Sequence, residues 1–299
     1  MDKANTIPYN LPSDAVWFIT GCSSGIGLAL AQAIAKTPNR VVTTARKPSS
    51  LADIPDNANV LKLALDVTSA SAIDDALGAA VSKFGRIDVV VNNAGYALVG
   101  DTESAGDKES RALMDTNFWG MVDVSKRAMG IMRDENPKTG KQGGVILNIS
   151  SMGGWMGYPA ASFYHASKFA MEGWTEAVAK ELPIEWNIHL CNIEPGGVKT
   201  NYASSSLKYM AERHPAYSNP AYPNNAVIAY MEDPKSRDGW VGADQISTAI
   251  YQLVSRGQRI PIRLPLGSDS WSAIMADLEK CKVDFEELKE FSNGVNRRS

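Results

Sequence analysis

Residues 15–27 of the chain read Ala-Val-Trp-Phe-Ile-Thr-Gly-Cys-Ser-Ser-Gly-Ile-Gly. The first five are apolar and typical of a buried strand, and residues 28–36 are strong helix formers, so a strand turns into a helix across three glycines. Gly21 suits a turn that other residues rarely adopt, Gly25 lets a pyrophosphate approach the backbone, and Gly27 lets the helix pack closely on the strand. The N–H groups at the helix start would then face the anion. The same pattern also fits an ordinary strand-to-helix turn.

A second group of residues lies far downstream. Ser151 precedes Tyr164 by 13 residues, and Tyr164 precedes Lys168 by four. The spacing of four puts Tyr164 and Lys168 on one face of the helix expected over residues 163–182. Such a pair arises readily by chance, but Ser151 follows the apolar run 145–149, and the carboxyl end of a strand is where open α/β sheets bind ligands. The glycine loop and this group, in this order and at these distances, indicate a nicotinamide-dependent oxidoreductase.

With these residues in view, the chain resembles the short-chain dehydrogenase/reductase family over about residues 14–265. The positions that match the family pattern are Thr20, Gly21, Gly25, Ile26, Gly27, Asp66, Val67, Asn92, Asn93, Ala94, Gly95, Asn117, Ser151, Tyr164, Lys168, Pro195 and Gly196. The resemblance implies that Tyr164 is the general acid/base and that Lys168 holds the nicotinamide ribose and lowers the pKa of the tyrosine. It also implies that Ser151 positions the carbonyl and that Asn117 supports a proton relay.

Elementary electrostatics agrees with the implied role of Lys168. A free tyrosine titrates near pH 10, about 3 units above neutrality, which corresponds to roughly 4 kcal/mol. An ammonium about 5 Å from the hydroxyl supplies roughly 3 kcal/mol of this at an effective dielectric constant of about 20. We therefore expect Lys168 to account for most of the lowering of the Tyr164 pKa, with the rest from Ser151 or a positively charged nicotinamide ring.

The resemblance also implies a set of cofactor contacts. They are Gly21, Ser23, Ser24, Gly25, Ile26, Gly27, Arg46, Lys47, Asp66, Val67, Asn93, Ala94, Gly95, Tyr164, Lys168, Pro195, Gly196, Val198 and Thr200. NAD enzymes usually carry a carboxylate at the end of the second strand, whereas here the run 41–44 leads into Ala45-Arg46-Lys47. Arg46 can hold a 2′-phosphate bidentately, so we expect NADP(H) as the cofactor. Ser24 offers only a hydroxyl where some NADP-dependent relatives have a second basic residue, and a solvated Arg46-Lys47 pair is the alternative.

The expected substrate pocket is apolar and aromatic. We expect its walls to include Tyr96, Trp155, Met156, Tyr158 and Tyr202. Residues 201–239 contain four prolines and five tyrosines, and in the family this region lies over the active site. We therefore expect a mobile lid over a bulky apolar substrate such as a cyclic or aryl ketone, with few charges to hold a phosphate or carboxylate.

The alternation of apolar strand-like runs with helix formers predicts the fold class. The runs are 15–19, 41–44, 60–63, 89–91, 145–149 and 188–193. They predict a doubly wound α/β fold of Rossmann type, with a parallel sheet and helices on both faces in one domain. We expect residues 14–265 to form the catalytic domain and residues 266–299 a helical extension packed on the same domain. The helical spacing of apolar residues over 270–291 fits packing on the core or at a subunit face. The polar stretch 134–144 is typical of a solvated loop.

Composition limits the other classes of function. A net charge of −3 gives no electrostatic footprint for nucleic acid. The amino terminus lacks the apolar stretch of a signal peptide and no run reaches membrane-spanning length, so we expect a cytoplasmic protein without a membrane partner. The three cysteines and three histidines lack metal-ligand spacing, which predicts no metal site. We also expect a homo-oligomer, either a dimer or a tetramer.

The sequence thus predicts an NADP(H)-dependent oxidoreductase that reduces a carbonyl, or oxidises a secondary alcohol, of a small organic molecule. Two alternatives stay open. The same site could catalyse a non-redox reaction such as dehydration or epimerisation, or the chain could be a nucleotide-sensing protein without turnover. The complete set of Ser151, Tyr164 and Lys168 argues against a sensor, because a binding protein has no need of a tuned acid.

Overall fold

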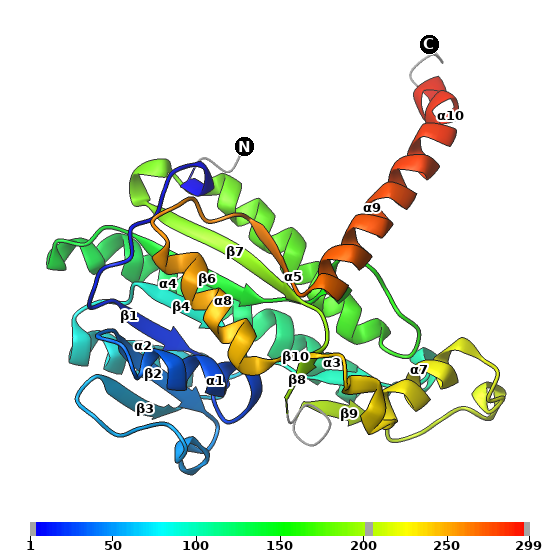
Figure 1. Cartoon of the computed structure of the whole chain (residues 1–299), viewed down its shortest axis with the longest axis horizontal. Coiled ribbons are helices and arrows are strands. Elements are labelled where there is room, and N and C mark those ends of the chain that lie inside the picture. Colours follow the sequence, from blue (N-terminus) through cyan, green and yellow to red (C-terminus); the bar gives the residue numbers. More distant parts are fainter. Residues whose placement is uncertain (1–3, 201–205, 296–299) are drawn as a thin grey trace.

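The computed structural model describes residues 4–200 and 206–295. Its centre is a seven-stranded sheet in the order β11-β7-β6-β4-β1-β2-β3, in which every neighbouring pair is parallel (Figure 1). The strands are β1 (Val16–Ile19), β2 (Arg40–Ala45), β3 (Val60–Ala64), β4 (Val89–Asn92), β6 (Gly144–Ile149), β7 (Ile188–Pro195) and β11 (Arg263–Leu266). The predicted parallel Rossmann-type sheet is confirmed. The last strand, β11, was not predicted.

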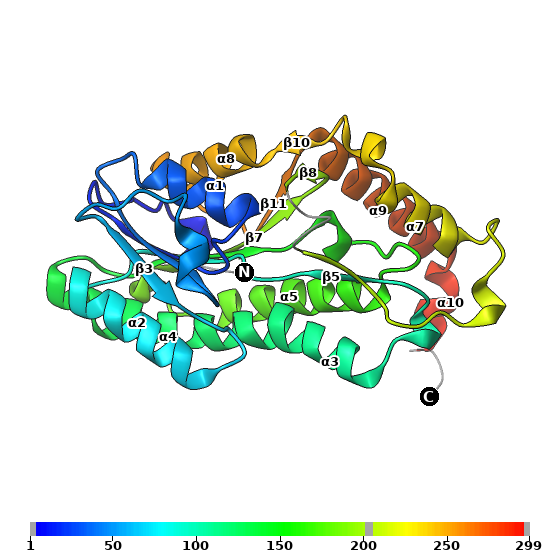
Figure 2. The same ribbon diagram turned by 90° about the horizontal axis from the view of Figure 1, so that it is seen from below.

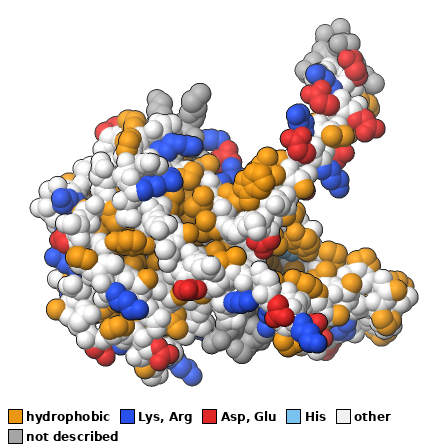
Figure 3. Space-filling model, in the orientation of Figure 1, with side chains coloured by type: hydrophobic (Ala, Val, Ile, Leu, Met, Phe, Trp, Pro, Cys, Tyr) orange, Lys and Arg blue, Asp and Glu red, His pale blue; other side chains and the backbone are white. Residues whose placement is uncertain are grey.

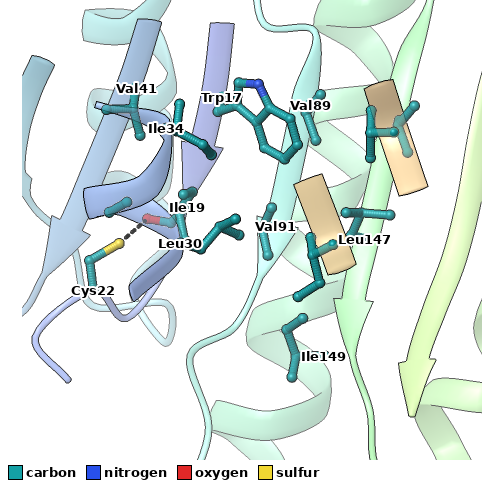
Figure 4. Packing of buried hydrophobic residues seen from close by; sticks show 14 of the residues in the cluster. Trp17, Ile19, Cys22, Leu30, Ile34, Val41, Val89, Val91, Leu147 and Ile149 are labelled. Carbon is teal, nitrogen blue, oxygen red and sulfur yellow. Dashed lines mark hydrogen bonds between the residues drawn. The ribbon is translucent and has the colours of Figure 1, made fainter. Parts of the chain in front are cut away.

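Helices cover both faces of this sheet, as predicted (Figure 2). One face carries α1 (Gly25–Ile34) and α8 (Ala243–Ser255), and the other carries α2 (Ala70–Phe84), α4 (Gly120–Asp134) and α5 (Ser162–Glu181). Successive side chains of a strand point to opposite faces. In β1, Trp17 and Ile19 pack toward α1, while Val16 and Phe18 belong to the other hydrophobic cluster. Figure 4 shows the first cluster, with Leu30 and Ile34 of α1 against Ile19 and Trp17.

The order of the strands creates the ligand crevice. The connections run from β1 to β2 and β3 on one side and then return to β4 on the other, so the order reverses between β1 and β4. In such sheets the loops at the carboxyl ends of the two strands diverge and leave a crevice. The glycine loop after β1 and the turn after β4 therefore lie at the place where a dinucleotide can bind.

Smaller elements extend the crevice beyond the sheet. Two-stranded pairs join β5 (Ala97–Val99) to β9 (Leu207–Tyr209) and β8 (Val198–Lys199) to β10 (Val241–Gly242), with α3 (Asp107–Met114) and α7 (Pro223–Glu232) beside them. Thus the described part of the 201–239 segment is more regular than its sequence suggested. The remaining short helical segments are Ala4–Thr6, Pro48–Leu51, Thr102–Ser104, the π-helix Asp115–Trp119, Asn136–Thr139, Met152–Gly154, Ile184–Trp186, Pro215–Tyr217 and Pro234–Arg237.

The polar stretch 134–144 is not simply a solvated loop. Its Asn136 is fully buried, and its amide group donates to the carbonyl oxygens of Ile87 and Gly143, both at 2.7 Å. Its side-chain oxygen accepts from the backbone N–H of Ile87 at 3.1 Å. One amide side chain therefore satisfies three backbone groups beside β4, which composition alone could not reveal.

The carboxyl-terminal segment is helical, but it is not packed along the domain as expected. Helix α9 (Ser268–Glu287) and α10 (Lys289–Gly294) project away from the body (Figure 1). Within α9 only Ser270 and Ile274 are buried. The reason is that β11 ends at the sheet edge and directs the helix outward, so the contact with the domain is limited to the first turns. Among the described residues, no helix is both long and apolar enough to cross a membrane.

Candidate active site

The glycine loop has the backbone geometry that its sequence predicts. Gly21 and Gly25 have φ values of 70° and 61°, in the left-handed region that disfavours side chains. A Cβ on Gly21 would lie 2.9 Å from the Cα of Ala94, and a Cβ on Gly27 would lie 2.7 Å from the carbonyl oxygen of Gly21. The loop is thus closely packed on the neighbouring turn, while its other side faces the crevice at the start of α1. Backbone N–H groups and the helix dipole suit a phosphate there, so the residues fit a dinucleotide.

The turn after β4 holds the glycine loop in place. The Asn93 amide donates to the carbonyl oxygens of Thr20 and Gly21, each at 2.9 Å. In return, the hydroxyl oxygen of Thr20 accepts from the backbone N–H groups of Asn93 and Ala94 at 2.9 and 3.0 Å. These reciprocal bonds join the two loops that follow β1 and β4 into one rigid surface.

Arg46 and Asp66 follow β2 and β3 at the far end of the crevice. Arg46 is exposed and forms no ion pair within residues 4–200 and 206–295. Burial raises the pKa of Asp66, but hydrogen bonds from Thr68 and the charge of Arg46 outweigh this and leave the pKa below its usual value. The guanidinium of Arg46 is therefore near enough to act on Asp66, yet it remains available to an anion.

The three residues of the predicted catalytic group come from two elements. Ser151 follows β6, and Tyr164 and Lys168 lie one turn apart on α5. The Lys168 ammonium donates to the carbonyl oxygen of Ile149 at 2.7 Å and lies 5.7 Å from the centre of the Tyr164 ring. The hydroxyl of Ser151 accepts from the backbone N–H of Gly153 at 3.0 Å, which fixes its side chain beside the tyrosine.

Asn117 lies in the π-helix between α3 and α4, behind the tyrosine rather than in the cavity wall. Its amide donates to the carbonyl oxygen of Tyr96 at 2.8 Å and to the hydroxyl of Ser167 at 3.1 Å. Its side-chain oxygen accepts from the backbone N–H of Tyr96 at 3.0 Å. The wide turn leaves this side chain facing β5 and α5, and such π-bulges are frequent at functional sites.

The sequence-based expectation that the pKa of Tyr164 is lowered was wrong for the structure as it stands. Burial raises the pKa of Tyr164 above its usual value of 10, and hydrogen bonding by Ser151 offsets only part of this. The pKa of Lys168 is itself lowered to about 8, mainly by burial, although Glu172 acts in the opposite direction. Lys168 donates to Ile149 instead of acting directly on the phenol, so it does not by itself bring Tyr164 toward neutrality.

One cavity of about 1040 Å³ joins these parts. The predicted cofactor and catalytic residues that line it are Gly21, Ser23, Ser24, Gly25, Ile26, Arg46, Asp66, Val67, Asn93, Ala94, Gly95, Ser151, Tyr164, Lys168, Pro195, Gly196, Val198 and Thr200. Gly27 and Lys47 lie outside its lining: Gly27 is packed under the loop, and Lys47 is exposed beside Arg46. The volume is large for a single small ligand and is sufficient for a dinucleotide with a substrate.

The predicted substrate residues divide into three groups. Tyr96 and Tyr158 line the cavity. Trp155 and Met156 do not line it. The indole N–H of Trp155 points away from the cavity and donates to Glu194 at 2.9 Å. Tyr202 lies outside the described residues.

The cavity lining also includes residues that the sequence analysis did not single out, among them the charged residues Asp269 and Lys208. Asp269, in the first turn of α9, accepts a hydrogen bond of 2.8 Å from the backbone N–H of Gly197. Lys208 of β9 lies 4.1 Å from the centre of the Tyr96 ring. Each of them reaches the cavity through a contact between distant segments, and no local motif marks either one.

A buried acidic cluster lies beneath the site. Arg263 of β11 donates to Glu172 at 3.0 Å and to Glu176 at 2.7 Å, and Asn192 donates to Glu172 at 2.6 Å. Burial and the nearby charge of Glu172 raise the pKa of Glu194 to about 8. Glu172 follows Lys168 by one helical turn, so the cluster is adjacent to the predicted catalytic group.

The described cysteines and acids do not assemble a metal site. All three cysteines are free thiols, and Cys22 and Cys191 are buried. Burial raises the pKa of Cys22 to about 12, so this thiol of the glycine loop is held protonated. In the part of the chain that the structure describes, no three His, Cys, Asp or Glu residues are grouped so as to hold a metal ion.

Comparison with known proteins assigns the chain to a family. The family model for short chain dehydrogenases matches residues 15–210. The chain is 43% identical to the oxidoreductase calM of Penicillium decumbens, over 98% of this chain and 96% of that one. It is 33% identical to the 3-ketodihydrosphingosine reductase of Bacteroides thetaiotaomicron, over 83% of this chain and 86% of the relative. A solved short-chain dehydrogenase from Streptomyces avermitilis has a TM-score of 0.80 and 29% identity, covering 94% of this chain and 99% of that one. The chain belongs to the short-chain dehydrogenase/reductase family and is an oxidoreductase, as its sequence predicted.

Proposed function

We propose that this oxidoreductase uses NADP(H) to reduce the ketone or other carbonyl group of a bulky, largely apolar organic molecule, or to oxidise the corresponding secondary alcohol. The observation that carries the proposal is the single cavity that joins the glycine loop to Ser151, Tyr164 and Lys168. A nucleotide-binding loop and a proton-donating group in one cavity are what hydride transfer to a carbonyl requires.

The choice of NADP(H) rests on Arg46. It is exposed at the cavity wall directly after β2, where a carboxylate would favour NAD. Its planar guanidinium can hold a 2′-phosphate through two parallel hydrogen bonds. The charge of Arg46 already lowers the pKa of Asp66, which supports an electropositive environment at this end.

Tyr164 is the proposed general acid/base, and Ser151 its partner at the substrate oxygen. When bound, NADPH supplies the hydride that the carbonyl carbon accepts. Ser151 would orient the carbonyl oxygen, and Tyr164 would donate its proton to that oxygen. Because the pKa of Tyr164 is raised by burial, its neutral form predominates at physiological pH, which suits protonation in the reductive direction.

Lys168 and Asn117 are proposed to support this proton transfer. The Lys168 ammonium, fixed by Ile149, lines the cavity at the place where a ribose would lie. Asn117 holds Tyr96 and Ser167 together and so keeps β5 and α5 at a constant separation around Tyr164.

The substrate end of the cavity is mostly apolar. Its walls there include Val99, Ala161, Val227, Tyr230, Met231 and Trp240. These side chains favour a bulky apolar molecule, in agreement with the name of the Bacteroides relative, a 3-ketodihydrosphingosine reductase. Lys208 is the cation at this end, and it would tolerate one polar or anionic group on the substrate.

The proposal is tested by following NADPH and NADH consumption at 340 nm with a panel of ketones, quinones and small keto acids. We expect turnover of bulky apolar ketones with NADPH. Tyr164→Phe should lower turnover by about 100-fold or more while the affinity for NADPH is retained, as loss of a general acid requires. Tyr158→Phe, which changes another tyrosine of the same cavity, is the control and should remain active.

Two results would contradict the proposal. Full turnover in Tyr164→Phe would assign the acid to another residue. A product without net redox change would favour a dehydratase or an epimerase. Cytoplasmic location and a homo-oligomeric state stay predictions from the sequence.

A further inference from the structure

The projecting helices α9 and α10, which together we call the arm, expose apolar side chains that the rest of the described chain does not cover. Figure 3 shows hydrophobic side chains at the base of this arm and along it, between acidic and basic ones. Trp271 is 58% exposed, Phe285 is 74% exposed and Leu288 is 54% exposed. A helix without tertiary contacts is only marginally stable in water, and exposed aromatic side chains at this density mark an interaction surface.

The apolar residues of the arm follow a heptad repeat. Beginning at residue 271, the intervals alternate between three and four, and the positions are Trp271, Ile274, Leu278, Cys281, Phe285 and Leu288. This is the a/d pattern of a two-stranded coiled coil. The helical hydrogen bonds continue across the junction of α9 and α10, because the backbone N–H of Leu288 donates to Asp284 and that of Ser292 donates to Leu288. The repeat therefore lies on one nearly continuous helical surface. Ile274 is buried against the domain, so the part of this surface that is open to a partner begins at Leu278 and includes Phe285 and Leu288.

The charges beside the repeat define the orientation of a partner helix. Asp277 and Asp284 occupy g positions, and Lys282 and Lys289 occupy the e positions of the following heptads. In a parallel pair, each g residue faces the e residue of the next heptad on the other helix. The two helices would then pair aspartate with lysine at every such contact. In an antiparallel pair, g faces g and e faces e, which would oppose like charges.

These observations lead us to propose that α9 pairs with α9 of a second copy of this chain in a parallel coiled coil. The intrahelical pairs of Lys282 with Glu279 and of Lys289 with Glu286 are exposed, so they compete only weakly with contacts across the interface. A membrane surface fits the arm less well. Residues 268–295 contain seven acidic and three basic residues, and a net negative helix is repelled by anionic lipids.

The parallel arrangement makes Cys281 a reporter of the interface. In a parallel pair, identical d positions face each other, so the two Cys281 thiols would lie in one layer. In an antiparallel pair, a positions face d positions and the thiols would be separated. Cys22 and Cys191 are fully buried, so they do not compete for a mild oxidant.

The first test measures mass in solution by light scattering on the full chain. The wild type should have twice the 32.3 kDa mass of the chain, or a higher even multiple. Phe285→Glu should halve this mass, because it puts a charge at an a position. Val283→Glu is the matched control, since Val283 is similarly exposed at 62% but lies outside the repeat, and its mass should not change. A monomeric wild type, or an unchanged mass for Phe285→Glu, would overturn the proposal.

The second test addresses orientation. The double variant Asp277→Lys with Asp284→Lys should weaken the dimer by about tenfold or more on dilution. Adding Lys282→Glu and Lys289→Glu should restore it, because the g and e charges are opposite again. Diamide, which oxidises two thiols to a disulfide, should link wild-type chains into covalent dimers and leave Cys281→Ser unlinked. Failure of both the charge restoration and the cross-link would show that the arm contacts its partner in another way and would refute the parallel pair.

Discussion

The two ends of the cavity are built in different ways. At the cofactor end, the glycine loop, Arg46, Asp66 and the turn 93–95 lie within a few positions of a strand's carboxyl end. Short reciprocal hydrogen bonds such as those of Thr20 and Asn93 hold the loops. At the substrate end, the walls come from residues 206–240, which reach the sheet only through contacts with distant segments. The cofactor end is therefore a property of the sheet, whereas the substrate end is a separate element attached to it.

The attachment of the substrate end depends on Asp101. This carboxylate is buried and receives two hydrogen bonds from Arg213, at 2.7 and 3.0 Å, as well as one from Asn224. The hydrogen bonds of Arg213 hold the pKa of Asp101 well below its usual value. Asn225 adds bonds to the carbonyl oxygens of Tyr217 and Asn219, at 2.8 and 2.6 Å. These polar bonds, the pairing of β9 with β5 and small apolar clusters that are separate from the two clusters of the sheet attach the element. We therefore expect that it can be altered without loss of the cofactor end.

The largest expected effect comes from a side chain in the glycine loop. Gly21→Ala would impose a Cβ at a φ of 70°, 2.9 Å from the Cα of Ala94. The loop must move to relieve this contact, so we expect the affinity for NADPH to fall by about 100-fold, measured by fluorescence titration. Gly78→Ala is the control, since nothing lies within 4 Å of its Cβ and alanine favours the helix. Unchanged affinity in Gly21→Ala would mean that the loop does not hold the cofactor.

The second prediction tests cofactor choice at the same end. Arg46→Asp should lower the ratio of NADPH to NADH affinity by about 10- to 100-fold, because one charge-assisted bidentate contact is lost and a repulsion is added. Lys47→Asp should change the ratio less, because Lys47 does not line the cavity. Both ratios are obtained by titrating each variant with the two cofactors. Equal affinities of the unmutated protein for NADPH and NADH would be incompatible with the proposed preference.

The third prediction tests whether the substrate end can be changed without affecting the cofactor end. Asp101→Asn weakens the bidentate bond to Arg213, so the KM for an apolar ketone should rise by about three- to tenfold while the affinity for NADPH stays constant. Glu103→Gln is the control, because Glu103 accepts only an exposed hydrogen bond of 3.2 Å from Tyr217. Steady-state kinetics and cofactor titration give the two readouts. A parallel loss of NADPH affinity would show that the two ends are not independent.

The smallest expected effect concerns the acidic cluster below both ends. The pKa of Glu194 is raised from 4.5 to about 8, so the folded protein holds a proton there that the unfolded chain releases. Its contribution to stability is complete below pH 4.5 and is lost as the pH rises toward 8. Glu194→Gln should reduce this fall in the free energy of unfolding, measured by urea denaturation at pH 5 and pH 8.

Glu176 supplies the opposite control for this measurement. Hydrogen bonds from Lys180 and Arg263 lower the pKa of Glu176 to about 2. Its contribution is therefore present above pH 4.5 and is lost as the pH falls toward 2. Glu176→Gln should leave the change between pH 5 and pH 8 as it is in the wild type, and a change equal to that of Glu194→Gln would argue against the assigned cause.

Sequence patterns predicted the cofactor end well and the substrate end poorly. Side chains alternate between the two faces of a strand, and residues four apart share one face of a helix. The parallel sheet, the glycine loop and the spacing of Tyr164 and Lys168 could be predicted because such patterns involve only residues that are close in sequence. Trp155 was expected in the cavity because it lies near Ser151 in sequence, but its indole is directed to Glu194. Proximity along the chain does not decide the direction in which a side chain points after a turn.

The amino-acid sequence by itself thus determined the fold class, the family, the nucleotide loop and the positions of Ser151, Tyr164 and Lys168, because local sterics and side-chain periodicity encode them. Tertiary structure alone decided that Asp269 and Lys208 reach the cavity, that burial raises the pKa of Tyr164, and that α9 leaves the domain. These features depend on which distant segments meet and on how much water they exclude. The heptad repeat of α9 and α10 can be identified from the sequence. Its apolar side chains are exposed to a partner only because α9 leaves β11 in a direction away from the domain.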